Sequence, residues 1–444
     1  MPQPDSPPFT WQRAPSLEPA FAIFCIESVA KLAHTTRSLG NAAPGSGGEA
    51  SVPRPPAPPA EASSLVRPGV PQSVMSKSGT ANGHFILTLL LITTSLACIG
   101  DSPPPPPPDT LVWLQPAPRT ENGRFANPVG ELLRGTNRVH ISFMWGRIKA
   151  TLRPRPGAPG TEDSGTAHYR AAAQGETTQG AQTQDAATVT WIGHATLLIE
   201  MDGVRFLTDP IWSKRASPIS WMGPARRVEP GILFEDLPKI DFVLISHNHF
   251  DHLDLPTLER IAQRDPEVTF YVPLGNAKLL LERGITRVVE LDWAQQATLH
   301  GVEIHCLPAQ HWSKRSLTDT YATLWSSWAV IGPKRRFFFA GDTGYFTGFK
   351  EIGEALGPFD LAAVPIGAYE PTEMMDLSHM NPEQAVWAAM DVDADTAVAI
   401  HFGTFDLADE PLDEPPKRFI QAAAGEGSAS LEAWVLSVGE LRQF

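Results

Sequence analysis

Cysteine is scarce in this chain of 444 residues, which contains only Cys25, Cys98 and Cys306. The three lie far apart and form no Cys-x-x-Cys pair. Neither a disulfide framework nor a zinc site built on thiolates is therefore expected. Any metal ion that the chain binds must be held by nitrogen and oxygen ligands.

Positive charge is also in short supply. The 35 Lys and Arg are outnumbered by 49 Asp and Glu, so the net charge at pH 7 is −14. Nonspecific binding to nucleic acid relies on a basic surface. We therefore expect no nucleic-acid partner.

The first 109 residues lack the pattern of a folded domain. Residues 1–74 are rich in Pro, Ala, Ser and Gly, and such a segment cannot bury enough apolar surface to offset its chain entropy. We predict that it is disordered, or that it lies upstream of a true start at Met75.

Residues 75–109 resemble a bacterial lipoprotein signal followed by a proline-rich spacer. Lys77 precedes an apolar run over 85–96, and small residues precede Cys98, although Ser95 stands where an aliphatic residue is usual. The resemblance implies a membrane-associated lipoprotein anchored through Cys98, with the membrane surface as a partner. A cleaved secretory signal or a short membrane anchor are the alternatives, and the run is short for a spanning helix.

Residues 110–186 are predicted to be a lead-in segment and linker, and residues 187–444 a catalytic domain. The aromatic and apolar side chains of the lead-in are expected to pack on the domain or to touch lipid; they are Trp113, Phe125, Phe143, Met144 and Trp145. After residue 187, short β-branched runs alternate with helical stretches, which indicates an α/β fold. The predicted strands are 188–192, 196–200, 205–208, 241–245, 268–272, 288–291, 302–307, 336–340, 361–365 and 396–400. The predicted helices include 255–264, 277–283 and 382–389.

One short segment carries most of the metal-binding residue types. A buried-strand pattern over 241–246 runs into His247-Asn-His-Phe-Asp-His252. In a loop that leaves a strand, His247 and His249 can project toward one point, and Asp251 and His252 toward a second. Imidazole and carboxylate suit zinc, iron or manganese. The density of histidine and aspartate disfavours the alternative, a solvated loop with incidental histidines.

Three later residues are candidates for completing such a site. His311, Asp342 and His401 each follow a predicted strand, where α/β folds place their chemistry. A lone aspartate after a strand is more often a cap or turn residue. The glycines that flank Asp342-Thr343 favour a ligand here, because they permit a tight turn that presents the carboxylate inward.

These residues, with several longer strings, resemble the N-acylphosphatidylethanolamine-hydrolysing phospholipase D family of the metallo-β-lactamase superfamily. The resemblance covers about residues 124–416 and leaves the first 110 residues outside. The strings that carry it are residues 190–196, 206–210, 215–218, 244–249, 337–345, 357–363, 365–371 and 401–405.

The resemblance implies an αββα sandwich with two divalent metal ions, Zn²⁺ above all, at one edge of its two sheets. One ion would be held by His247, His249 and His311. The other would be held by Asp251, His252 and His401. Asp342 would bridge the two ions.

The resemblance also implies residues that contact substrate. His379 matches a family histidine near the substrate phosphate, although it could instead open the helix that follows Asn381-Pro382. Phe250 stands at a substrate-contacting position where the family often has Tyr, and Ser378 stands where Gln is usual. Other histidines are not expected to be ligands: we predict that His194 is a structural hydrogen-bonding residue near the site, and that His300 and His305 are surface or core residues.

The expected reaction is hydrolysis of N-acylphosphatidylethanolamine to N-acylethanolamine and phosphatidic acid. A hydroxide bridging the two metal ions would attack phosphorus, so the catalytic residues would be His379, Asp342 and Asp251. The phospholipid needs an apolar route, and the candidates for its wall, each of which could instead be ordinary core, are Trp145, Trp221, Trp293, Trp312 and Phe250. The chain could assemble as a homodimer. The rival functions are another metallo-hydrolase, such as a lactonase or general phosphodiesterase, and a non-catalytic lipid-binding lipoprotein.

Overall fold

The computed structural model describes residues 115–129, 186–425 and 430–444. The predictions for residues 1–109, including the lipidation of Cys98, lie outside these ranges, as do Trp113, Phe143, Met144 and Trp145. None of the described helices combines the length and the apolar composition needed to cross a bilayer.

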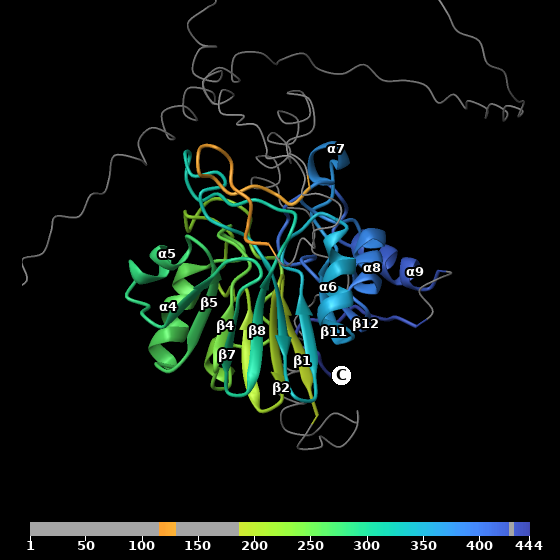
Figure 1. Ribbon diagram of the computed structural model, residues 1–444, viewed down its shortest axis with the longest axis horizontal. Coiled ribbons are helices and arrows are strands. Elements are labelled where there is room, and N and C mark those ends of the chain that lie inside the picture. Colours follow the sequence, from red (N-terminus) through yellow and green to blue (C-terminus); the bar gives the residue numbers. More distant parts are fainter. Residues whose placement is uncertain (1–114, 130–185, 426–429) are drawn as a thin grey trace, which may run out of the picture. The chain divides into compact units, whose positions relative to one another are not determined.

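Two seven-stranded mixed sheets form the centre of the fold (Figure 1). The first has the order β14-β1-β2-β3-β4-β5-β6, and its strands β3 to β6 are parallel. Its strands are β14 (Leu441–Gln443), β1 (Thr188–Gly193), β2 (Thr196–Met201), β3 (Val204–Thr208), β4 (Phe242–Leu244), β5 (Thr269–Pro273) and β6 (Val288–Leu291).

The second sheet has the order β13-β12-β11-β10-β9-β8-β7, and its strands β10 to β13 are parallel. Its strands are β13 (Glu432–Trp434), β12 (Ala394–Ile400), β11 (Phe359–Pro365), β10 (Arg336–Phe339), β9 (Ser327–Ile331), β8 (Val302–Leu307) and β7 (Gln296–Leu299).

Alternating apolar side chains fill the core on both faces of the sheets, because successive residues of a strand face opposite sides of its sheet. On β4, Phe242 and Leu244 belong to the larger core cluster, and Val243 belongs to a second cluster that includes Leu258 and Ile261. Leu197 and Leu198 of β2 divide in the same way. Strands that are buried on both faces need cover on both sides, which helices supply.

Helices cover the outer face of each sheet (Figure 1). On the first sheet these are α4 (Leu255–Arg264) and α5 (Ala277–Leu281), and on the second α6 (Gly348–Leu356), α8 (Pro382–Asp391) and α9 (Glu414–Ala423). Short helical turns lie at Phe234–Asp236 (η3) and Thr372–Met375 (α7). The predicted αββα sandwich is therefore confirmed.

Most predicted elements occur with small shifts of their ends. The helix over 255–264 and the strands over 288–291 and 302–307 match the structure, whereas α5 ends at residue 281, two residues early, before a turn in which Gly284 has φ of 77°. Strands β7, β9, β13 and β14 and helices α6, α7 and α9 were not among the predicted elements. His300 lies in the turn between β7 and β8 with φ of 50°.

The loops with the candidate ligands all leave the carboxyl ends of strands at one edge of their sheet. In the first sheet, β1 leads to His194, β3 to Asp209 and β4 to the segment 247–252. In the second sheet, β8 leads toward His311, β10 toward Asp342 and β12 directly to His401. Strands that run in the same direction deliver their following residues to the same edge, which explains why distant parts of the sequence meet there.

Candidate metal centre

Three histidines present ring nitrogens to one point. His247 Nε2 lies 2.8 Å from His249 Nδ1, and His311 Nε2 lies 3.3 Å from the same atom. All three rings are buried or nearly so. Their ligand atoms lie within 4.8 Å of one another, which suits a single small cation.

A second group lies beside the first. His252 Nε2 and His401 Nε2 lie 3.3 Å and 3.5 Å from Asp251 Oδ2. His194 Nε2 approaches the same oxygen at 3.0 Å. This group therefore offers imidazole nitrogens and a carboxylate oxygen around a second point.

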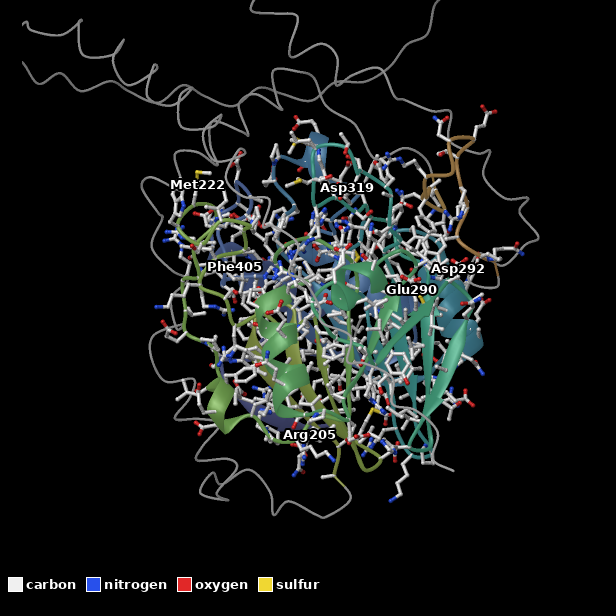
Figure 2. All side chains as sticks on the ribbon, turned by 90° about the vertical axis from the view of Figure 1, so that its left-hand side faces the viewer. Arg205, Met222, Glu290, Asp292, Asp319 and Phe405 are labelled. Carbon is white, nitrogen blue, oxygen red and sulfur yellow. The ribbon has the colours of Figure 1, made fainter. Side chains whose placement is uncertain are left out.

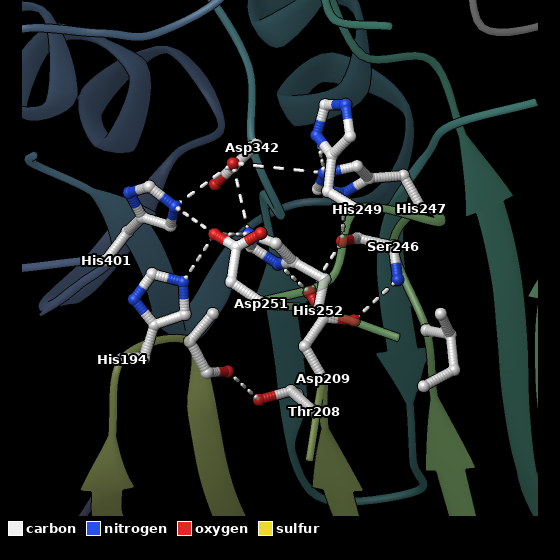
Figure 3. Close-up of polar contacts among 12 residues, drawn as sticks. His194, Thr208, Asp209, Ser246, His247, His249, Asp251, His252, Asp342 and His401 are labelled. Carbon is white, nitrogen blue, oxygen red and sulfur yellow. Dashed lines mark hydrogen bonds and ion pairs between the residues drawn. The ribbon is translucent and has the colours of Figure 1, made fainter. Parts of the chain in front are cut away.

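Asp342 belongs to both groups through one oxygen (Figure 3). Its Oδ2 lies 3.1 Å from Nε2 of both His252 and His401. The same oxygen lies 4.0 Å from His247 Nε2 and 3.9 Å from His311 Nε2. A single carboxylate is thus placed between the two groups, as a bridging ligand requires.

The rings are oriented by hydrogen bonds on their far sides. His252 Nδ1 lies 2.7 Å from Asp209 Oδ2, and Asp209 also accepts hydrogen bonds from the main-chain N–H and the hydroxyl of Ser246. His311 Nδ1 lies 2.9 Å from the carbonyl oxygen of Ser378. Such partners direct Nε2 of each ring into the centre and are typical of histidines that bind metal.

Several buried polar atoms at the centre have no hydrogen-bond partner among the described residues. Those that face the two groups are Nε2 of His252, Nε2 of His401 and Oδ1 of Asp342, and Nδ1 of His379 lies beside them; the two Nε2 atoms are within ion-pair distance of Asp342 Oδ2 but form no hydrogen bond with it. Buried polar groups in folded proteins are almost always satisfied, so a group of orphaned atoms needs an explanation. A donor set of imidazole and carboxylate with unused lone pairs fits divalent cations.

The electrostatics of the metal-free chain lead to the same conclusion. Burial lowers the pKa of His249 to about 4 and that of His247 and His311 well below the usual value. Burial would also lower the pKa of His401 and His252, but the nearby carboxylate of Asp342 raises the first to about 9 and the second well above its usual range. Two imidazolium groups therefore stand where cations would bind, and binding would displace their protons.

The ring of His379 faces the centre. Its Nδ1 lies 4.0 Å from Asp342 Oδ2, and its ring centroid lies 5.1 Å from that of His311. Burial lowers its pKa to about 4. Asn381-Pro382 open α8, as the alternative for His379 required, with Asn381 accepting a hydrogen bond from the N–H of Gln384; His379 itself lies two residues before this cap.

The aromatic residues proposed to line a route for lipid lie in different environments. The ring of Phe250 lies beneath the guanidinium of Arg315 at 4.1 Å, and Trp312 packs edge-on against His249 at 4.6 Å. Trp221 is 66% exposed. Trp293 is wrong as a wall residue: it is buried in the core, where its Nε1 donates to the carbonyl oxygen of Trp325.

The histidines that were not expected to be ligands divide into two groups. His194 hydrogen-bonds Asp251, as predicted, and it also offers a ring nitrogen to the group that contains Asp251, His252 and His401. Burial lowers its pKa to about 3, so its ring is neutral. His305 on β8 pairs with Glu303 at 3.1 Å, and His300 is exposed in its turn; neither belongs to the two groups.

Sequence reasoning assigned no role to Asp209 or Asn127. Asp209 follows β3 as Asp342 follows β10, so the same strand-exit criterion could have found it. Asn127 accepts a hydrogen bond from the main-chain N–H of His311 at 2.9 Å, although 184 residues separate them. No sequence pattern carries that contact.

The part of the chain that carries this centre is similar to known proteins. Residues 204–402 match the family model described as the β-lactamase superfamily domain. Over 228 residues the chain is 47% identical to N-acyl-phosphatidylethanolamine-hydrolyzing phospholipase D 1 of Caenorhabditis elegans, covering 49% of this chain and 64% of that protein. Over 245 residues it is 34% identical to the mitochondrial N-acyl-phosphatidylethanolamine-hydrolyzing phospholipase D of Saccharomyces cerevisiae, covering 54% and 52%. The chain thus spans less than two thirds of the length of either relative.

Among solved structures, Igni18, a metallo hydrolase from Ignicoccus hospitalis, is similar with a TM-score of 0.45 and 23% sequence identity. The similarity covers 58% of this chain and 98% of that one.

Proposed function

We propose that this chain, which carries a metallo-β-lactamase superfamily domain related to the N-acylphosphatidylethanolamine-hydrolysing phospholipases D, is itself a phospholipase D with this substrate. The observation that carries the proposal is the position of Asp342 Oδ2 between two groups of histidines. That arrangement supports a dinuclear hydrolase. The 47% identity to a protein named for this lipid supports the choice of substrate.

The proposed reaction is a hydrolysis in which one bond to phosphorus replaces another. The oxygen of water bonds to phosphorus, and the bond from phosphorus to the oxygen of the N-acylethanolamine group breaks. The departing alkoxide takes up a proton, and the products are N-acylethanolamine and phosphatidic acid.

Two divalent ions, of which zinc is the proposed species, would be held by the two groups described above. The first would use His247, His249 and His311, and the second Asp251, His252 and His401, with Asp342 shared. When bound, such ions lower the pKa of water and neutralise charge on phosphoryl oxygens.

The residues around the ligands have positioning roles in this proposal. Asp209 holds the ring of His252 so that Nε2 faces the centre, and the carbonyl oxygen of Ser378 does the same for His311. His194 restrains Oδ2 of Asp251. Restrained ligands are already in the geometry that the reaction needs, so little reorganisation is required when substrate binds.

His379 is the proposed contact to the substrate phosphate. Its pKa of about 4 leaves the imidazole neutral near pH 7, with one N–H donor and one acceptor. Nδ1 faces Asp342 and has no hydrogen-bond partner among the described residues. In the tautomer that carries its proton on Nδ1, the ring can donate a hydrogen bond to a phosphoryl or leaving oxygen at the centre.

Apolar side chains near the centre suit a lipid. Trp312 borders His249, and Phe250 lies within the ligand loop itself. Trp221 and its neighbour Met222 are exposed. Met222 and Asp319 lie toward one end of the molecule, and Arg205 lies at the opposite end (Figure 2). Membrane attachment through a lipidated Cys98 and assembly as a homodimer remain predictions.

The decisive experiment is an assay of the purified chain on N-acylphosphatidylethanolamine, with products identified by mass spectrometry. We expect phosphatidic acid and N-acylethanolamine, with oxygen from labelled water appearing in the phosphatidic acid. Bis(p-nitrophenyl) phosphate and a homoserine lactone are assayed in parallel. Rapid lactone opening with no lipid turnover would overturn the proposal in favour of a lactonase.

A further inference from the structure

A segment outside the matched family domain is fastened to the loop that carries His311. This strap, defined as residues 115–129, precedes the matched residues 204–402 and crosses one end of the fold (the orange segment in Figure 1). The main-chain N–H of Ala117 donates to Asp292 Oδ1 at 3.0 Å, and the N–H of Phe125 donates to the carbonyl oxygen of Tyr321 at 2.9 Å. Asp292 lies close to the strap in Figure 2.

The strap is held by buried as well as polar contacts. Phe125 is only 3% exposed and belongs to the larger core cluster. The guanidinium of Arg124 donates to the carbonyl oxygens of Thr320 and Thr318 at 2.8 Å and 2.9 Å. The segment is therefore an integral part of the folded domain at the 310–321 loop.

The contacts of greatest consequence lie at its end. Asn127 Oδ1 accepts the main-chain N–H of His311 at 2.9 Å. The side chain of the adjacent Gln310 makes two hydrogen bonds to the main chain of Val129. Its Oε1 accepts from the N–H of Val129, and its Nε2 donates to the carbonyl oxygen of Val129. Two neighbouring residues of the loop are thus tied to the strap.

The same loop is tied to the segment that carries Asp342. The N–H of Gln310 donates to the hydroxyl of Thr343 at 2.9 Å, and the N–H of Gly344 donates to the carbonyl oxygen of Gln310 at 2.8 Å. Because Thr343 directly follows Asp342, the strap, the His311 loop and the Asp342 loop form one connected set of hydrogen bonds.

We infer that Asn127 is a positioning residue for His311, and that the strap is part of the metal centre although it contributes no ligand. The ring of His311 is oriented by the carbonyl oxygen of Ser378, and its main chain is located by Asn127. The contact with Ser378 fixes the rotation of the imidazole ring. The contact with Asn127 fixes the position of the main chain that carries the ring. Loss of the second would let Nε2 move away from His247 and His249.

This inference rests on the metal centre of the proposed function, and it is tested by metal binding rather than by lipid turnover. The affinity of the chain for Zn²⁺ is measured by competition with a chromogenic chelator in three variants. Asn127→Ala removes the acceptor, Asn127→Asp retains an acceptor oxygen, and Asn122→Ala alters an exposed asparagine on the same strap.

Partners of metal ligands change metal affinity by about 10- to 100-fold when they are removed. We expect Asn127→Ala to weaken one of two zinc equivalents by about 10-fold and to leave the other near its original affinity. Asn127→Asp and Asn122→Ala should bind both equivalents as the unaltered chain does. Hydrogen exchange should become faster at the amide of His311 in Asn127→Ala alone.

A purely structural role for Asn127 would lower the melting temperature and leave both zinc affinities unchanged, which overturns the inference. Equal losses in Asn127→Asp and Asn127→Ala would overturn it as well, because the acceptor would then not be the cause. If Asn127→Ala does not fold, Gln310→Ala releases the strap at Val129 instead. In Gln310→Ala we expect faster hydrogen exchange at the amide of His311 and weaker binding of one zinc equivalent. An unchanged exchange rate and unchanged zinc affinities in this variant would refute the inference.

The two proposals can fail separately. If the unaltered chain binds two zinc equivalents, Asn127→Ala weakens one of them and no lipid is hydrolysed, the proposed substrate is wrong and the positioning role stands. If lipid is hydrolysed and Asn127→Ala binds zinc as tightly as the unaltered chain, only the positioning role is wrong.

Discussion

Replacing Asp209 by asparagine should damage the metal centre without removing a ligand. Asp209 is fully buried and accepts three hydrogen bonds: from Ser246 N–H at 2.7 Å, from Ser246 Oγ at 2.5 Å and from His252 Nδ1 at 2.7 Å. Asparagine has a single acceptor oxygen and an NH₂ group that only donates. It is similar in size, so the change tests the hydrogen bonds and not the packing.

Neither orientation of the new amide can satisfy its neighbours. If the NH₂ group faces His252, Nδ1 must become an acceptor, and the ring proton moves to Nε2, the atom that would bind metal. If the NH₂ group faces Ser246, it meets the main-chain N–H of that residue, and an unsatisfied buried donor costs about 1–3 kcal/mol. The first orientation should weaken metal binding by about 10- to 100-fold, or about 1.4–2.7 kcal/mol, whereas the second should lower the free energy of unfolding.

The assay is a zinc titration of Asp209→Asn by chelator competition, followed by turnover of lipid at limiting and excess zinc. Asp241→Asn is the matched control, because Asp241 accepts the N–H of Arg205 and makes no contact with the centre. We expect reduced zinc affinity and reduced kcat in Asp209→Asn and near-normal values in Asp241→Asn. A folded Asp209→Asn protein with unchanged zinc affinity and kcat would refute the tautomer argument.

Four further outcomes are expected. Asp342→Ala should lower kcat by at least about 100-fold while circular dichroism stays unchanged; retained activity would contradict its shared position. In the metal-free chain the pKa of His401 is raised from 6.5 to about 9, so its stabilising contribution is present below about pH 6.5 and lost as the pH rises through about 9. Urea unfolding of chelator-treated protein should show this fall, and no fall would contradict the assigned charge. Trp293→Phe should lower the free energy of unfolding by about 1–3 kcal/mol with normal kcat. Trp221→Ala should change stability by less than about 0.5 kcal/mol and raise KM for lipid vesicles but not for bis(p-nitrophenyl) phosphate.

The strand that leads into the ligand loop could be predicted because its pattern is local. An apolar run over 242–245 followed by histidines and aspartates indicates a buried strand with a polar exit, and β4 occupies Phe242–Leu244. The short strands β13 and β14 were missed because their sequences, Glu-Ala-Trp and Leu-Arg-Gln, contain no continuous apolar run. They form only by pairing with β12 and β1.

Residue type alone could not separate core from site. Trp293 and Trp312 are both aromatic residues that follow predicted strands, and both were candidates for the wall of a lipid route. Trp293 lies in the core against Trp325, and Trp312 lies against His249. Which of two such residues is accessible depends on what packs against it, and the packing partners come from distant parts of the chain.

By itself the sequence determined the chemical character of this protein: nitrogen and oxygen ligands without thiolates, an α/β domain after residue 187, and seven candidate ligands at strand exits. Those features are local, since each depends on residue type and on the few residues around it. Only the tertiary structure decided that Asp342 Oδ2 stands between two groups of histidines, that Asp209 orients His252, and that Asn127 holds the main chain of His311. The contact between Asp209 and His252 spans 43 positions and forms because β3 and β4 pair, and the contact between Asn127 and His311 spans 184 positions. Asp342 reaches His252 of the first sheet only when the two sheets pack together.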